Sequence, residues 1–581
     1  MTFSLLLPLI FPLLLAALIA WPVMRPLVWR LLPLAALPAL MLAVLAPLPM
    51  GIGSDWLLMG AAFGLDEISR LFLIFTALLW IAAGAAARGW FSGDARQPGF
   101  ATWFLLAMAG NLGLILAQEA LTFYAFFALM SFASYGLVIH ARSASAYHAG
   151  RLYIAFVILG ELALFAGLVL AVAQADSRLL ADLRAAEISG LAAAFLIAGF
   201  AVKLGVMPLH FWLPLAHGAA PVPASAVLSG AMIKAGLYGM LAALPLGVQA
   251  LPDHGTVLMA AGLVTVFTAV ILGLGQDSPK TVLGFSSVSQ MGLIALGLGA
   301  GLMAPAAWPA LLPILVFLAA HHALAKGALF LGTGLFSAQV VPSRRALTLL
   351  LLAAPALVLA GLPLSSGALG KEALKTAFAT GSDAWLPWLT VALTLSGLAT
   401  TLLMARFAVT LWRAAPTAPA AASPEALTVP VLGLAAGALA LPFVWGAVAG
   451  PIAAQILATE PSDPWPLALG IVFAVAALIR AHARAVGPQK FLQQLADPFV
   501  MLGDRVAAQA ARKRRALRRL ARQIPKTLSE QAHRHRIGQS AIAALILLIF
   551  AIEASSARQE AGPAVTQAIV PAERNSDMPI P

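Results

Sequence analysis

The chain contains no cysteine in 581 residues. Disulfides, iron–sulfur clusters and thiolate metal sites are therefore excluded within it. Charged residues are also scarce, at 10%, whereas 61% of the residues are hydrophobic. A soluble fold of this length does not need so much apolar sequence, so the composition predicts a protein that lies in a membrane.

Motifs for binding a cofactor are missing as well. No glycine-rich dinucleotide fingerprint, phosphate-binding loop or haem motif occurs. We therefore expect no cofactor, no metal and no catalytic redox site in this chain. The net charge of +12 suggests nucleic acid at first, but the basic residues lie in short loops and one tail segment. That distribution is typical of membrane topology and predicts no nucleic-acid partner.

Long apolar runs recur along the chain. Their lengths predict an all-α polytopic membrane protein with about 14–16 transmembrane helices. We expect six parts. They are N-terminal transmembrane helices (1–100), a core (101–415), C-terminal transmembrane helices (416–482), a basic amphipathic helix that is cytoplasmic or lies laterally on a membrane or partner (483–537), a last transmembrane helix (538–553) and a disordered tail (554–581).

Loop charges are asymmetric. The loops 49–68, 244–255, 301–306 and 451–463 carry no lysine or arginine. Because cytoplasmic loops are enriched in these residues, the asymmetry predicts a multi-pass protein of a bacterial-type plasma membrane with both termini outside the cytoplasm. The expected inner loops carry Arg25, Arg88, Arg96, Arg142, Arg151, Lys280, Arg344, Arg345 and Arg413.

The segment 199–239 holds two lysines within apolar sequence. Lys203 and Lys234 lie on either side of a stretch broken by Pro208 and Pro214, with His210 between the two prolines and His217 after them. A lysine at membrane depth costs several kcal/mol, so it usually faces the protein interior or a water path. Two such lysines around a helix break indicate a route for a proton or ion.

A second break follows near 346–380. Residues 361–372 read GLPLSSGALGKE and place Lys371 just after the break. The two broken spans are an odd number of crossings apart, which inverts their direction. Paired broken helices in corresponding positions predict two inverted repeats with a transport site.

Four ordered blocks resemble the antiporter-like membrane subunits of respiratory complex I, membrane-bound hydrogenases and multisubunit cation/proton antiporters. The text of 199–239 is most similar to the hydrogenase-4 and formate-hydrogenlyase type. The other blocks are 277–290 (DSPKTVLGFSSVSQ), 321–331 (HHALAKGALFL) and 361–372.

The resemblance implies a proton relay of buried lysines, histidines and one glutamate. Its members would be Lys203 in the first broken helix, Lys234 on the next helix, His322 and Lys326 on one helix face, and Lys371 in the second half. His210 and His217 have either a structural role or one at the cytoplasmic access. His321 faces away from His322, and a structural role is favoured for it.

One residue departs from the family pattern. Residues 127–135 read FALMSFASY, so Ala128 stands where the family has a glutamate. Glu161 lies about as far after the intervening loop as Ala128 lies before it, which gives both a similar membrane depth. We therefore expect Glu161 to replace the missing carboxylate, with Glu119 as the alternative.

The resemblance implies a proton-translocating subunit of a membrane-bound redox complex, hydrogenase-like or complex I-like, with electron transfer in other subunits. It leaves open whether the ion is H⁺ or Na⁺. Three alternatives remain: a subunit of a cation/proton antiporter, a proton-coupling membrane partner of a separate transport protein, and a scaffold that has lost its path. The expected partners are other membrane subunits and the lipid bilayer.

Overall fold

The computed structural model describes residues 2–54, 60–378, 386–415, 422–460 and 463–483, all within one compact unit. Twelve helices in these ranges are long and apolar enough to cross a membrane, and three shorter apolar helices accompany them. The predicted all-α, multi-pass architecture is confirmed. Of the segments expected at 483–537, 538–553 and 554–581, all but residue 483 lie outside the described residues, so the last predicted spans are not among the helices described.

The N-terminal part leads into the first repeat. Short 3₁₀ turns join α1, α2 and α3, and Asp66 caps α4 by accepting from Ser69 N at 2.7 Å. The helices up to the first break are α1 (Thr2–Leu18), α2 (Arg25–Leu31), α3 (Leu37–Leu45), α4 (Glu67–Trp90), α5 (Gln97–Leu116), α6 (Ala120–Val138), α7 (Ala144–Ala175), α8 (Leu180–Ala185) and α9 (Gly190–Leu204).

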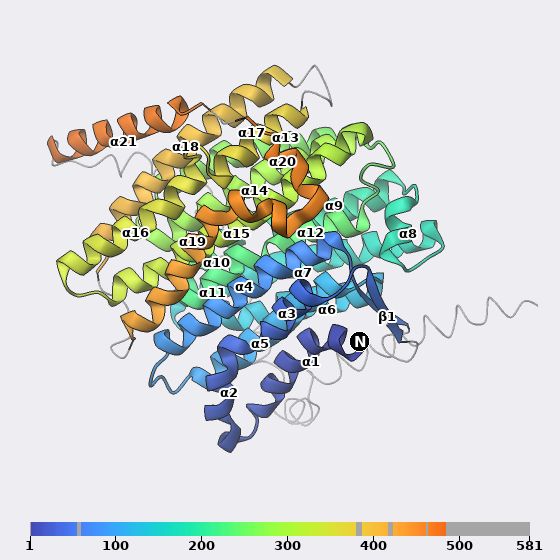
Figure 1. Cartoon of the computed structure of the whole chain (residues 1–581), viewed down its shortest axis with the longest axis horizontal. Helices are drawn as coiled ribbons and strands as arrows, with labels where there is room; N and C mark the ends of the chain where they lie inside the picture. The colour runs from blue at the N-terminus through green and yellow to red at the C-terminus, as the bar shows by residue number, and fades with distance from the viewer. Residues whose placement is uncertain (1, 55–59, 379–385, 416–421, 461–462, 484–581) are drawn as a thin grey trace, which may run out of the picture. The chain divides into compact units, whose positions relative to one another are not determined.

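The remaining helices complete both repeats and the C-terminal part (Figure 1). A π-helical segment, Leu228–Met232, lies between α11 and α12. The helices are α10 (Trp212–Ala219), α11 (Val222–Val227), α12 (Lys234–Ala243), α13 (Pro252–Leu274), α14 (Pro279–Met303), α15 (Trp308–Ala338), α16 (Pro342–Ala360), α17 (Ser366–Phe378), α18 (Leu386–Arg413), α19 (Pro424–Ala449), α20 (Ala454–Leu457) and α21 (Trp465–Ala483).

Two repeats of five spans share the same packing. In the first repeat α5 packs on α6, α9 on α7, and α12 on α9. In the second repeat the corresponding pairs are α13 with α14, α16 with α15, and α18 with α16. Because an odd number of crossings separates α9 from α16, the repeats are inverted, as the two sequence breaks predict.

Both breaks begin with the same backbone motif. α9 ends at Gly205 and α16 ends at Gly361, with φ of 79° and 102°. In each case the glycine N–H and the following N–H donate to one carbonyl, that of Ala201 or of Leu357. Glycine adopts this left-handed conformation without a Cβ clash, so it ends a helix sharply. A proline two or three residues later prevents the helix from resuming at once.

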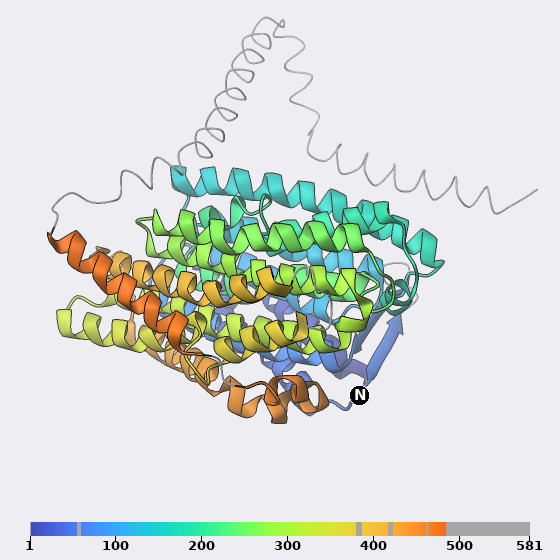
Figure 2. The same cartoon turned by 90° about the horizontal axis from the view of Figure 1, so that it is seen from above.

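Two features differ from the sequence prediction or extend it. The loop expected at 49–68 contains an antiparallel hairpin of β1 (Met50–Ser54) and β2 (Ala61–Leu65), whose glycine-rich strands carry little strand signal. Helix α7 is the long cyan helix along one edge of the bundle in Figure 2. Its Leu159 and Leu162 are 56% and 64% exposed, so this edge faces lipid or a partner.

The absence of native cysteine makes the orientation directly testable. Single cysteines at the exposed positions Ser92 and Ser343 should be protected from an impermeant thiol reagent in intact cells, and one at Val248 should react. All three should react after the membrane is opened. The opposite sidedness would contradict the assignment of both termini to the outside.

Candidate functional site

Lys203, Ser131 and Glu161 form a cluster in the first repeat. The Lys203 ammonium donates to Ser131 Oγ at 3.1 Å. The Ser131 hydroxyl lies beside the Glu161 carboxyl, on which Lys203 also acts electrostatically. Lys203 and Glu161 are only 4% and 5% exposed. Three helices, α9, α6 and α7, thus bring a buried lysine and a buried acid next to one hydroxyl group.

The surroundings hold this cluster in place. The Tyr153 hydroxyl donates to Ser131 O at 2.8 Å and ties α7 to α6. Trp212, beyond the break, donates to Val202 O at 2.8 Å and fixes the last turn of α9. Lys203 lies in that last turn, where the negative end of the helix dipole favours a positive charge.

Lys234 joins the two repeats. Its ammonium donates to Ser229 O at 2.6 Å and contacts His322 Nδ1 directly. Ser229 belongs to the π-helical segment, and such segments occur often at functional sites because they release backbone groups. Since Lys234 is on α12 and His322 is on α15, this contact crosses the boundary between the repeats.

Lys326 continues the central cluster one turn after His322. Its ammonium donates to Leu283 O on α14 at 3.0 Å. The same carbonyl accepts from Ser287 Oγ, which in turn pairs with Ser229 Oγ at 2.7 Å. His322 and Lys326, four residues apart, share one helix face, as the sequence predicts. Ser229 and Ser287 connect their hydrogen-bond partners into one polar layer.

His217 links this layer to one end of the bundle. Its ring stacks on Phe330 with 4.6 Å between centroids, and both ring nitrogens are buried without a partner in the described chain. The nearby cations Lys326, Lys280 and Lys234 act on it electrostatically. Lys280, expected in a solvated loop, is instead half-buried in the first turn of α14 and donates to Ala220 O at 2.7 Å.

The second break brings Lys371 and His321 together. Lys371 contacts Leu359 O, at 3.4 Å, in the last turn of α16. His321 Nδ1 bonds with Ser366 Oγ at 2.9 Å at the start of α17, and Lys371 acts on His321 electrostatically. His321 therefore connects α15 to the second break, while its neighbour His322 faces the first repeat.

Glu119 and His210 have different surroundings. The Glu119 carboxylate caps α6, accepting from the backbone N–H groups of Leu121 and Thr122 and from the Thr122 hydroxyl at 2.8–2.9 Å. These three hydrogen bonds are local, which fits a structural role. His210 is buried against Phe211 in the first break, with Nδ1 unpartnered among the described residues.

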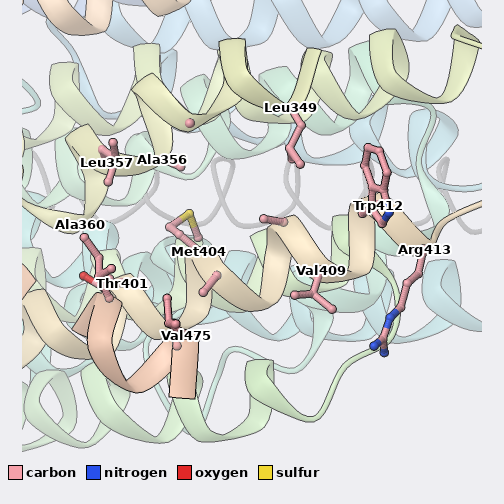
Figure 3. Close-up of a pocket in the computed structure, with 15 residues that line it drawn as sticks. Leu349, Ala356, Leu357, Ala360, Thr401, Met404, Val409, Trp412, Arg413 and Val475 are labelled. Atoms are coloured by element: carbon pink, nitrogen blue, oxygen red, sulfur yellow. The ribbon is translucent and has the colours of Figure 1, made fainter. Parts of the chain in front are cut away.

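A cavity of about 550 Å³ between α16, α18 and α21 lies apart from these residues. Figure 3 shows Ala360 and Thr401 at one end of it and Trp412 and Arg413 at the other. Its walls are apolar apart from Thr401 and Arg413, and none of the buried lysines, histidines or glutamates described above lines it.

Comparisons with known proteins agree with this geometry. Residues 117–399 match the family described as NADH:quinone oxidoreductase/Mrp antiporter, transmembrane. The chain is 35% identical to hydrogenase-4 component B of Escherichia coli K12 over 260 residues, which are 43% of this chain and 37% of that protein. It is 32% identical to Na⁺/H⁺ antiporter subunit A1 of Staphylococcus haemolyticus over 284 residues, 46% of this chain and 35% of that protein.

The fold is also similar to a solved one. A chain in the structure of the Mrp complex from Dietzia sp. DQ12-45-1b superposes with a TM-score of 0.66 at 24% identity, over 81% of this chain and 100% of that one. The aligned segments cover well under half the length of each of the two sequence relatives. The fold similarity, in contrast, extends over the whole of the solved chain.

The Glu161–Lys203 cluster predicts energetic coupling. Removing either partner alone leaves a buried charge without its counterpart, a change that typically costs about 3–5 kcal/mol. Glu161→Gln and Lys203→Met should therefore each lower the unfolding temperature in detergent. The double variant should lose about 1–3 kcal/mol less than the sum.

The exposed carboxylate Glu187 supplies a matched control. Glu187→Gln should change the unfolding temperature little and should add independently to Lys203→Met. Strict additivity of Glu161→Gln and Lys203→Met would show that the two groups do not interact.

Proposed function

We propose that this chain, whose residues 117–399 match the NADH:quinone oxidoreductase/Mrp antiporter transmembrane family, translocates protons as a subunit of a membrane-bound redox complex. The observation that carries the proposal is the set of buried ionisable groups from Glu161 to Lys371, which falls into a first cluster around Lys203, a central cluster around Lys234 and a third at Lys371. It crosses both repeats and includes the Lys234–His322 contact between them.

An imbalance of buried charge supports a moving proton. Four lysines in the described chain are buried to 6% exposure or less, and only two carboxylates are. Glu119 is used as a helix cap, which leaves Glu161 as the one buried acid facing a lysine among the described residues. Ammonium groups on the other three lysines would have no facing carboxylate and would cost several kcal/mol each inside a membrane, which favours a neutral form for some of them.

The first cluster has the geometry of a switch. When Lys203 is charged, it donates to Ser131 Oγ. If the Ser131 hydroxyl passes its proton to the Glu161 carboxylate while receiving one from Lys203, both partners become neutral and charge is conserved. Lys203 can then accept the next proton. The hydroxyl thus permits exchange without direct contact of the two ionisable groups.

The path beyond this switch runs through the centre of the bundle. Lys234 and His322 pass the proton between repeats, Lys326 lies one turn further, and His321 with Ser366 leads to Lys371 at the second break. Neutral imidazole can accept at one nitrogen and donate at the other, which suits both histidines to relay roles. His217, beside Lys280, connects this layer to the end of the bundle that we assign to the cytoplasm.

The coupled reaction is proposed from the relatives. The match to hydrogenase-4 component B favours redox coupling, and the match to a Na⁺/H⁺ antiporter subunit supports the alternative of cation/proton exchange. This chain would need partner subunits in either case. Purification of the tagged chain with its stably bound partners distinguishes the two, because only a redox complex carries electron-transfer subunits.

The lysine path predicts loss of transport without loss of assembly. Lys203→Ala, Lys234→Ala and Lys326→Ala should each lower proton uptake into vesicles by at least about tenfold, which corresponds to a barrier raised by about 1.4 kcal/mol or more. Lys375→Met is the control. Lys375 lies one turn after Lys371 and pairs at 2.8 Å with the half-exposed Glu372. It should change the rate less than about twofold.

Two outcomes would contradict the path. Normal uptake in the three alanine variants would exclude a relay through these lysines. Equal loss in Lys375→Met would indicate a general effect of removing a charge.

The proposed replacement of the family carboxylate makes a separate prediction. Glu161→Gln should impair proton uptake as severely as Lys203→Ala, because the switch loses its acceptor. Adding Ala128→Glu to Glu161→Gln should restore part of the rate, since a carboxylate then returns on α6, three residues before Ser131. Normal uptake in Glu161→Gln would show that the proton bypasses this group.

A further inference from the structure

A basic cavity lies at the end of the bundle where α1 and α4 end and α2 and α5 begin. Its volume is about 360 Å³, within the usual range for small-molecule sites. None of the residues that line it is acidic. They are Ile19, Arg25, Pro26, Val28, Trp29, Arg30, Arg88, Gln97, Pro98 and Ala101.

The charges in this cavity are not balanced by the protein. Arg25 Nε donates to Ile19 O at 3.1 Å, whereas Arg30 and Arg88 form no ion pair or hydrogen bond within the described chain. Asp94, in the turn between α4 and α5, is already bound by Arg96 at 2.8 Å. Three guanidinium groups thus line one cavity without a counter-anion.

A helix end strengthens the preference for an anion. Gln97 and Pro98 are the first residues of the 20-residue α5, so the positive end of its dipole lies at the cavity wall. Guanidinium groups bind phosphate oxygens through paired hydrogen bonds. The arrangement therefore favours a phosphate group over a carboxylate or a small halide.

The rim of the cavity indicates where that phosphate comes from. The chain around it exposes large apolar side chains: Val23 is 84% exposed, Trp21 60% and Leu27 46%. Such a rim is stable when it faces lipid. Trp29, inside the cavity, is the amphipathic type of ring that collects at headgroup depth. Basic cavities between transmembrane helices on the cytoplasmic side bind anionic lipid headgroups.

We propose that this cavity binds the headgroup of an anionic glycerophospholipid, with the phosphate between Arg25, Arg30 and Arg88 and the acyl chains along the apolar rim. The lipid would join α1 and α2 to the start of the first repeat. This site is separate from the proton path, whose residues do not line it.

Native mass spectrometry of the full-length protein in neutral detergent tests the proposal. Titration with phosphatidylglycerol should show one tightly bound lipid, and phosphatidylethanolamine should bind more weakly. Arg30→Gln with Arg88→Gln should weaken phosphatidylglycerol binding roughly thirtyfold, at about 1 kcal/mol per basic residue. The double change leaves Arg25 and its bond to Ile19 intact, so the fold is kept.

The control removes two exposed arginines at the same end of the bundle, Arg142→Gln with Arg344→Gln. It should weaken binding less than about twofold. Equal weakening by both pairs would show general attraction to the surface and overturn the site. Equal binding of phosphatidylethanolamine would overturn selection by charge, and displacement of the lipid by millimolar inorganic phosphate would identify a site for soluble anions instead.

Discussion

A lysine ammonium inside a membrane must find oxygen acceptors, and this requirement accounts for the irregular parts of the bundle. Regular helices offer few free carbonyls, because most are bonded along their own helix. The π-helical segment presents Ser229 O to Lys234, and the end of α16 presents Leu359 O to Lys371. The irregular segments thus supply acceptors to two of the four buried lysines, while Lys203 uses Ser131 Oγ and Lys326 uses Leu283 O within α14.

The two repeats share this backbone but differ in chemistry. The first break is paired with a buried acid, Glu161, and with Ser131 between acid and lysine. At the second break Lys371 lies near His321, and its neighbour Glu372 is bound to Lys375 on the surface. The inverted repeats therefore differ: one half can form an internal ion pair, and in the other half the lysine lies near a histidine.

The sequence predicted the parts of this arrangement that depend on the energetic cost of burying a charge and on the position of a residue along the chain. Lysines in apolar spans and glycine–proline breaks are visible in a single sequence, and counting from the loop singled out Glu161, which lies beside Ser131. It could not predict Ser131 or the contact of His321 with Ser366, since these depend on how each helix is rotated against its neighbours. Glu119 was ambiguous for the same reason, as its capping role requires the local turn geometry.

The central claim is that Glu161 and Lys203 exchange a proton through Ser131. Infrared difference spectroscopy during a pH change in reconstituted membranes measures this directly, through the carbonyl stretch of a protonated carboxyl group. A carboxyl band should appear in the native protein, vanish in Glu161→Gln, and shift its pH dependence in Lys203→Met. A band that persists in Glu161→Gln, or one unaffected by Lys203→Met, would contradict the account.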